Sequence, residues 1–116
     1  MEVFGGPAGR KGRKLQMVHH LSPERVQAMA RSGQALIVDV REGSEYRTGH
    51  IPRAKHISLG QLLQRIREVP KDKTVVVVCR SGNRSSKAAE LLSQAGYRHV
   101  FNMAGGMQRW TGPVDQ

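Results

Sequence analysis

Residues 75–86 read VVVVCRSGNRSS, and this stretch decides how the chain folds. Four consecutive β-branched valines favour an extended strand, and a continuous apolar run is typical of a strand that is buried on both faces. The run ends at Cys79, and a glycine, an asparagine and two arginines follow within five positions. Two interpretations follow: the end of a core strand with an ordinary turn, or a nucleophile held in an anion-binding loop.

The rest of the sequence alternates strand and helix patterns around this stretch. ALIVDV (35–40) is a second continuous apolar run and predicts another buried strand. LSPERVQAMARSG (21–33) predicts a helix with Ser22 at its N-cap and Pro23 at its first position. RSSKAAELLSQAG (84–96) predicts a second helix. Buried strands that alternate with helices predict an α/β fold with a parallel sheet.

Weaker patterns fill the remaining segments. They predict a loop with one helical turn at 41–54 and a short strand at 55–58. An amphipathic helix is expected at 58–69, with Leu59, Leu62, Leu63 and Ile66 at helical spacing. A final strand is expected at 98–103, followed by a turn into a short helix at 104–110.

Composition limits the function classes. The chain has 116 residues, enough for one domain, and no apolar run approaches the length of a membrane span. Its basic start is not followed by the apolar segment of a secretory leader. A single cysteine cannot form an internal disulfide, which favours a reducing compartment. The expected location is therefore the cytoplasm, with no membrane span.

Positive charge is concentrated at the front of the chain. Nineteen Lys and Arg against nine Asp and Glu give a formal net charge of +10, which favours anionic partners. GRKGRK (9–14) lies in a Gly-rich stretch without periodicity, so residues 1–20 are predicted to be a flexible basic segment, and residues 21–116 the folded domain. No aromatic residue interleaves these cations, so nucleic acid is not the expected partner.

The segment after Cys79 has the features of an anion-binding loop. If Cys79 ends a strand and a helix begins near Arg84, the short connection turns its N–H groups toward one point, and Gly82 permits such a turn. The helix N-terminus adds free N–H donors, and nearby arginines favour ionisation of the thiol. The sequence therefore predicts Cys79 as a thiolate nucleophile. The predicted substrate-binding residues are Arg80, Ser81, Gly82, Asn83 and Arg84.

Polar residues also follow the other strong strand. Asp39 and Arg41 lie at the end where parallel α/β sheets bind ligands, and we interpret them as a structural ion pair that supports the loop. Glu45 is expected to belong to the same polar set. His19 and His20 have no partner ligands at useful spacing, so no metal site is expected.

Three separate stretches of the chain resemble one known family. VDVREGSEYRTGHIPRAKHI (38–57), VVVVCRSGNRS (75–85) and GYRHVFNMAGGMQRW (96–110) are similar to signatures of single-domain rhodaneses, or thiosulfate sulfurtransferases. The resemblance covers about residues 20–111. It implies a three-layer rhodanese-like fold, in which helices flank a central, mostly parallel sheet of about five strands.

The resemblance also implies a reaction. In this family the loop cysteine, here Cys79, accepts a sulfane sulfur from thiosulfate or a similar donor and becomes a persulfide. The sulfur then passes to cyanide, a thiol or an acceptor protein, without a metal or organic cofactor. The chain departs from the common family pattern at Arg53 and His56, where glycine and asparagine are usual; neither position is expected to touch the loop.

Two alternatives to sulfur transfer stay open on the sequence. A phosphatase or arsenate reductase uses the same kind of thiolate, but tyrosine-phosphatase loops are one residue longer than the spacing from Cys79 to Arg84, and a reductase cascade needs further cysteines. A non-catalytic binding module with this fold is the other alternative. Relatives of that kind typically lose the loop cysteine, which this chain keeps.

Overall fold

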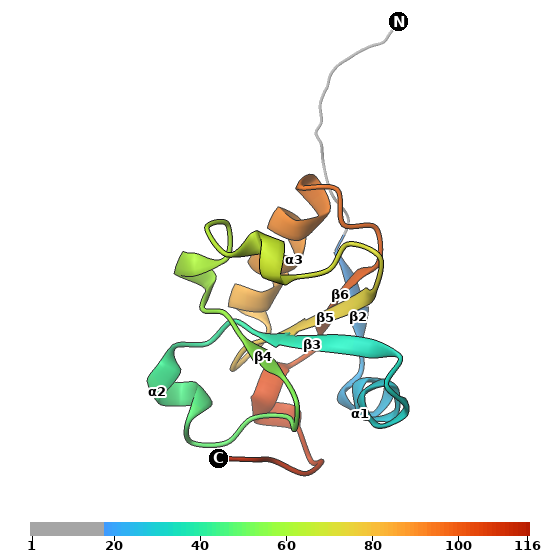
Figure 1. Cartoon of the computed structure of the whole chain (residues 1–116). Coiled ribbons are helices and arrows are strands. Elements are labelled where there is room, and N and C mark those ends of the chain that lie inside the picture. Colours follow the sequence, from blue (N-terminus) through green and yellow to red (C-terminus); the bar gives the residue numbers. More distant parts are fainter. Residues whose placement is uncertain (1–17) are drawn as a thin grey trace, which may run out of the picture.

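The sheet has five strands, all parallel to their neighbours, in the order β2-β6-β5-β3-β4 (Figure 1). The computed structural model describes residues 18–116. The predicted α/β fold with a central parallel sheet of about five strands is confirmed. The strands are β2 (His19–Leu21), β3 (Ala35–Asp39), β4 (Lys55–His56), β5 (Thr74–Val78) and β6 (Val100–Met103).

Helices lie on both faces of this sheet (Figure 1). None of the helices within residues 18–116 is long and apolar enough to cross a membrane. The α-helices are α1 (Pro23–Ser32), α2 (Gly43–Tyr46) and α3 (Asn83–Gln94), and the 3₁₀ helices are η1 (Leu59–Gln61), η2 (Ile66–Glu68) and η3 (Gly106–Arg109).

The four valines of β5 explain the layered core. Successive side chains of a strand point to opposite faces of the sheet. Val77 belongs to the buried cluster that contains Leu92 of α3, whereas Val76 belongs to the cluster that contains Val26 of α1. All four valines are fully buried. A strand with helices on both sides needs an apolar residue at every position, and this is why the run is continuous.

Helix α1 has the ends that its sequence predicts. The Ser22 side chain accepts a hydrogen bond from the Arg25 N–H (3.1 Å), and Pro23 occupies the first helical position. Gly33 ends the helix with a φ of 75°, a left-handed conformation that glycine adopts without a steric penalty. Helix α3 begins at Asn83, one residue before the predicted start, so Asn83 and Arg84 both lie in its first turn.

The predicted amphipathic helix at residues 58–69 is wrong. This segment forms the two short 3₁₀ helices η1 and η2, joined by turns. A 3₁₀ helix repeats every three residues, so residues i and i+3 share a face. Leu59 and Leu62 therefore both pack on the core, while Leu63 is 59% exposed. The α-helical spacing had placed Leu63 on the buried side.

Strand β2 begins within the segment 1–20, which the sequence analysis separates from the folded domain. His19 and His20 belong to strand β2, and they lie opposite Phe101 and Asn102 of β6. Strand β2 is only three residues long and contains two exposed histidines, so its sequence has no apolar strand signal. The basic stretch 9–14 lies outside the described residues.

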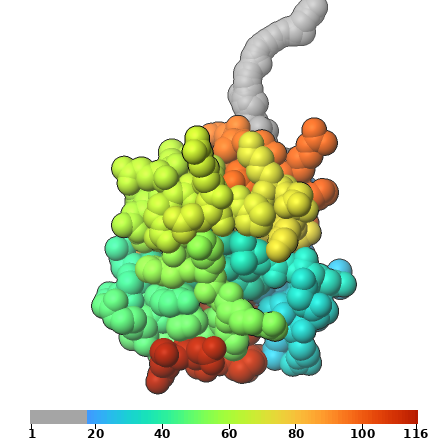
Figure 2. Space-filling model, in the orientation of Figure 1, coloured from blue at the N-terminus to red at the C-terminus, as the bar shows by residue number. Residues whose placement is uncertain are grey.

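The C-terminal residues return to the segment around residue 50. Figure 2 shows them in red along the surface next to this green segment. His50 and Asp115 form a short antiparallel bridge, in which each N–H donates to the other residue's carbonyl at 2.9 Å. The bridge fixes the loop that follows α2.

Candidate active site

Strands β3 and β5 bring the two predicted polar sets to one edge of the sheet. They are adjacent and parallel, and Asp39 lies opposite Val78 in the register. Cys79 directly follows Val78, and Arg41 follows the end of β3 by two residues. Ligands bind at the carboxyl ends of the strands in such sheets. The arrangement therefore places Cys79 where a substrate site is expected.

Three groups that can donate hydrogen bonds lie within hydrogen-bond distance of the Cys79 sulfur. Cys79 is fully buried, and its Sγ lies 3.1 Å from the Gly82 nitrogen and 3.3 Å from the Ser85 nitrogen. The Ser85 hydroxyl oxygen is also 3.3 Å from this sulfur. Both residues belong to the start of α3, where backbone N–H groups have no partner within the helix. This arrangement suits a sulfur that carries negative charge.

These contacts shift the ionisation of the thiol. Burial raises the pKa of the Cys79 thiol, because it disfavours the charged form. Hydrogen bonds from the hydroxyl and N–H of Ser85, and from the N–H groups of Gly82 and Ser81, act in the opposite direction. Their combined effect is larger, so the pKa of Cys79 lies below its ordinary value. A lower pKa makes more of the nucleophilic thiolate available near neutral pH.

Two glycines allow the loop its compact shape. Gly82 has a φ of 103°, which a residue with a side chain rarely adopts. Gly106 has a φ of 63°, and a Cβ at this position would collide with the carbonyl groups of Arg80 and Cys79. This close approach lets η3 bind the loop, because the Met107 N–H donates to the Cys79 carbonyl at 2.8 Å.

Arg84 is held by a carboxylate from a distant part of the chain. Its two terminal nitrogens each lie 2.8 Å from one carboxylate oxygen of Glu45, in α2. The hydrogen bond from Arg84 is the main reason why the pKa of Glu45 falls to about 2. Glu45 therefore pairs with Arg84, and not with the set of Asp39 and Arg41 to which the sequence had assigned it.

The remaining predicted loop residues differ in their exposure. The side chains of Arg80, Ser81 and Asn83 face solvent, whereas Gly82 is buried. Arg80 is more exposed than Arg84. The sequence-predicted residues from Cys79 to Arg84 thus form one turn, with Cys79 buried beneath it.

Asp39 and Arg41 form a buried ion pair. The Arg41 guanidinium donates through Nε and Nη2 to the carboxylate, and the shortest contact is 2.8 Å. Nη2 also donates to the Gly49 carbonyl at 2.8 Å, and the His56 Nε2 lies 2.7 Å from the Arg41 carbonyl oxygen. The pair therefore joins the end of β3 to two other segments.

A groove lined mainly by polar residue types opens beside the loop. It has a volume of about 390 Å³. Arg80 and Glu45 are among its lining residues, and so is Met107, whose N–H holds the Cys79 carbonyl. The groove therefore gives access to the loop from solvent. Its other lining residues are Arg41, Ser44, Thr48 and Gln108.

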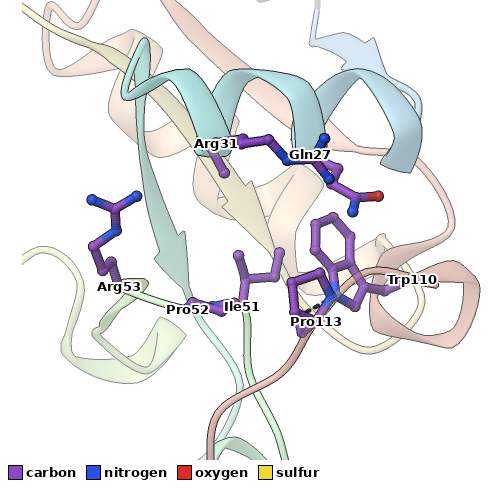
Figure 3. A pocket seen from close by; sticks show the side chains of 8 residues that line it. Gln27, Arg31, Ile51, Pro52, Arg53, Trp110 and Pro113 are labelled. Carbon is purple, nitrogen blue, oxygen red and sulfur yellow. Dashed lines mark hydrogen bonds between the residues drawn. The ribbon is translucent and has the colours of Figure 1, made fainter.

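An apolar cavity of about 180 Å³ lies elsewhere. Figure 3 shows α1 above it, the segment containing Ile51 and Pro52 below it, and the Trp110 ring at one side. The Trp110 indole N–H donates to the Pro113 carbonyl at 3.0 Å, which closes this end. No residue from Cys79 to Arg84 lines the cavity. The cavity therefore has no nucleophilic thiol in its lining, and we assign the candidate active site to the loop that contains Cys79.

The sequence analysis missed Ser85, which contacts the sulfur, and Asn102, which contacts Ser85. Ser85 is fully buried and contributes both a hydroxyl and an N–H to Sγ. Its hydroxyl also bonds to the Asn102 side chain, which is buried in β6. A serine after a loop arginine gives no signal of its own. The signal available was Asn102, a polar residue in the apolar strand pattern VFNM.

The part of the chain that the structure describes contains no group of three or more His, Cys, Asp or Glu side chains that could hold a metal ion. The candidate site therefore consists of a thiol, backbone N–H groups, a serine hydroxyl and arginines. These groups can form a covalent intermediate on sulfur and stabilise negative charge beside it.

Two curated relatives match this chain over most of their own length. A sulfurtransferase from Allochromatium vinosum is 39% identical over 95 residues, covering 81% of this chain and 89% of that protein. The thiosulfate sulfurtransferase GlpE of Pseudomonas syringae pv. syringae is 38% identical over 90 residues, covering 78% and 84%. The chain spans only 43% and 64% of the length of two Bacillus subtilis relatives that it also matches.

A solved structure and a family model agree with these relatives. The crystal structure of a rhodanese-related protein from Thermoplasma volcanium superposes with a TM-score of 0.78 at 29% identity, covering 84% of this chain and 97% of that one. The model of the rhodanese-like domain family matches residues 22–113, which include β3, the Cys79 loop and η3. The chain belongs to the rhodanese-like domain family.

Proposed function

We propose that the protein is a sulfurtransferase that carries a sulfane sulfur as a persulfide on Cys79. The observation that carries this proposal is the Cys79 sulfur at the start of α3, where N–H groups of Gly82 and Ser85 and the Ser85 hydroxyl converge on it. Such donors stabilise negative charge on either the thiolate or a persulfide. Relatives named as sulfurtransferases support the same assignment.

The first half-reaction loads the sulfur. The Cys79 thiolate attacks the outer sulfur of thiosulfate, an S–S bond forms to Sγ, and the S–S bond of thiosulfate breaks. Sulfite leaves with the electron pair of that bond, and the persulfide retains one negative charge. Charge and atoms balance without an oxidant or a metal.

The second half-reaction unloads it. An external nucleophile such as cyanide, a thiol or an acceptor protein attacks the outer sulfur of the persulfide, and the Cys79 thiolate is regenerated as the leaving group. Cys79 is the single cysteine of the chain, so no second thiol of the same chain can resolve the persulfide. A reducing compartment keeps a reactive thiol in its free form, and we place the reaction in the cytoplasm for this reason.

The groove beside the loop is the proposed entrance for the donor. Arg80 lines this groove with a positive charge, which attracts an anionic donor. Arg84 binds Glu45 in this structure, so the sulfonate end of thiosulfate would compete with that carboxylate for the guanidinium. The N–H groups of Ser81, Gly82 and Asn83 would hold the transferred sulfur.

The test is the intact mass of the protein before and after thiosulfate, measured in parallel with Cys79→Ser. We expect the protein to gain the mass of one sulfur atom, and cyanide to remove it. The variant should gain nothing. If the protein gains no sulfur from thiosulfate, mercaptopyruvate or glutathione persulfide, the sulfurtransferase proposal is wrong.

The observation that Cys79 has no exposed surface favours one alternative, a binding module that uses the fold without catalysis. In that case Cys79 is a small buried core residue. An alkylating agent separates the two functions: an active thiolate reacts faster than free cysteine at neutral pH, whereas an inert core thiol reacts more slowly.

A further inference from the structure

A chain of side-chain hydrogen bonds leads from the Cys79 sulfur to the protein surface. Sγ contacts the Ser85 hydroxyl at 3.3 Å, this hydroxyl bonds to Asn102 Oδ1, and Asn102 Nδ2 lies 3.0 Å from His20 Nδ1. Ser85 and Asn102 are buried, and His20 is exposed. The sequence analysis assigned no role to His20.

The sheet register brings these side chains together. His20 of β2 lies directly opposite Asn102 of β6, and in a parallel pair such residues face the same side of the sheet. Asn102 in turn lies opposite Val77 of β5, a member of the core cluster on the α3 side. Ser85, in the first turn of α3, approaches Asn102 from above this face.

The Ser85 hydroxyl has one proton and two neighbours that can accept it. It can donate either to the Cys79 sulfur or to the Asn102 oxygen, but not to both at once. In the direction that the structure shows, the amide oxygen faces Ser85 and the amide nitrogen faces His20. This direction leaves the hydroxyl oxygen free to accept a proton from a neutral thiol.

The reverse direction suits the thiolate. When the Asn102 amide turns end for end, its nitrogen donates to the Ser85 oxygen, and the Ser85 proton is free to donate to Sγ. The amide oxygen then faces His20, whose Nδ1 must carry a proton. A protonated His20 ring always meets this requirement, whereas a neutral ring meets it in one of its two tautomers.

We propose that His20, Asn102 and Ser85 form a hydrogen-bond relay that controls the ionisation of Cys79. Ser85 contacts the reacting sulfur, while Asn102 and His20 are positioning residues that determine where the Ser85 proton points. A proton donor at position 20 favours the thiolate, and a group at position 20 that only accepts favours the thiol. The inference deepens the proposed function, because it concerns the same thiolate.

Among residues 18–116, few other charged side chains belong to the elements that form the relay. Strands β5 and β6 contain no titratable residue. Helix α3 contributes Arg84, which binds Glu45, and Lys87 and Glu90, which lie 3.7 Å apart. On β2 itself the other titratable group is His19, next to His20.

The test replaces His20 by a donor or by an acceptor. In His20→Lys the new group only donates, and in His20→Glu it only accepts. The ultraviolet absorbance of the thiolate, followed against pH and corrected with Cys79→Ser, gives the pKa of Cys79. We expect this pKa to be lower in His20→Lys than in His20→Glu by about one unit or more, as for the gain and loss of a hydrogen bond to a charged atom.

His19 provides the matched control. It is the exposed neighbour of His20 on the same edge strand, and its side chain points to the opposite face. His19→Lys and His19→Glu make the same charge changes without contact to Asn102. A charge about 10 Å away through solvent changes a pKa by a few tenths of a unit. If the pKa of Cys79 differs between the Lys and Glu variants by the same amount at position 19 as at position 20, the relay proposal is wrong.

A second background separates the hydrogen bonds from the charge. In Asn102→Leu the relay is cut, so the difference between Lys and Glu at position 20 should fall to the value found at position 19. A difference that persists in this background would also overturn the proposal. The measurement reads ionisation and not sulfur transfer. The relay and the proposed function can therefore fail independently. A protein that takes up no sulfur can still show the pKa difference between His20→Lys and His20→Glu, and a protein that takes up sulfur can still lack this difference.

Discussion

At the scale of single residues, Ser85 determines much of the chemistry of Cys79. It donates to the sulfur through its backbone and stands at the start of the relay through its hydroxyl. Burial alone raises the pKa of the Cys79 thiol, and the opposing hydrogen bonds bring it below its ordinary value. The hydroxyl of Ser85 is the largest of these hydrogen-bond contributions, ahead of the backbone N–H groups of Ser85, Gly82 and Ser81.

This reasoning predicts a pH profile. The rate of sulfite release from thiosulfate should rise with pH as Cys79 loses its proton, with a midpoint below the ordinary pKa of cysteine. Ser85→Ala should move the midpoint up by about one unit, because one hydrogen bond to the thiolate is lost. Ser93→Ala, the same change further along α3, is the control. A midpoint that does not move in Ser85→Ala would show that the backbone N–H groups suffice.

At the scale of elements, the loop after β5 depends on η3. The N–H groups of Met107 and Gln108 donate to the carbonyls of Cys79 and Arg80, at 2.8 and 3.0 Å. The Arg80 carbonyl belongs to the same trans peptide group as the Ser81 N–H, so the two point in opposite directions. By holding the two carbonyls, η3 fixes the orientation of the peptide groups in the loop. Gly106 makes this possible because the two backbones approach too closely for a Cβ.

Gly106→Ala should therefore disturb both stability and sulfur transfer. The added Cβ collides with two carbonyl groups, and alanine is strained at a φ of 63°. We expect a loss of about 2–4 kcal/mol in the free energy of unfolding, measured with urea, and slower persulfide formation in the folded fraction. Gly60→Ala is the control, since nothing lies within 4 Å of its Cβ. Equal losses in both variants would contradict the role of the close approach.

The elements also differ in how far their sequences predict them. Strand β5 and helix α1 follow from local patterns, because four valines need burial on two faces and Ser22 caps its helix directly. Strand β2 exists through its pairing with β6, which no local pattern reveals. Residues 58–69 have helical spacing, but the core accepts them as 3₁₀ turns. The position of Cys79 at the end of β5 was predictable from the local sequence. The pairing of Arg84 with Glu45 was not, because the two residues are 39 positions apart.

At the scale of the whole molecule, the buried pair of Asp39 and Arg41 joins segments that are far apart in the sequence. It connects the end of β3 to Gly49, and the Arg41 carbonyl is bound by His56 at the end of β4. This part of the chain carries α2 and Glu45, the residue that holds Arg84. The pair therefore positions one wall of the candidate site without contacting the sulfur.

Asp39→Asn should cost a large share of the stability of the domain. The buried Arg41 guanidinium, 6% exposed, would keep its charge without a carboxylate, which costs about 3–5 kcal/mol. Domains of this size have a free energy of unfolding of about 5–15 kcal/mol, so the loss is readily measured by urea unfolding. Glu90→Gln, the same chemical change in the exposed pair with Lys87, should cost less than about 1 kcal/mol.

The double variant Asp39→Leu/Arg41→Met should recover much of the loss, because it removes both charges from the interior. If Asp39→Asn costs no more than Glu90→Gln, the ion pair does not hold these segments together, and other contacts, such as the bridge between His50 and Asp115, must do so.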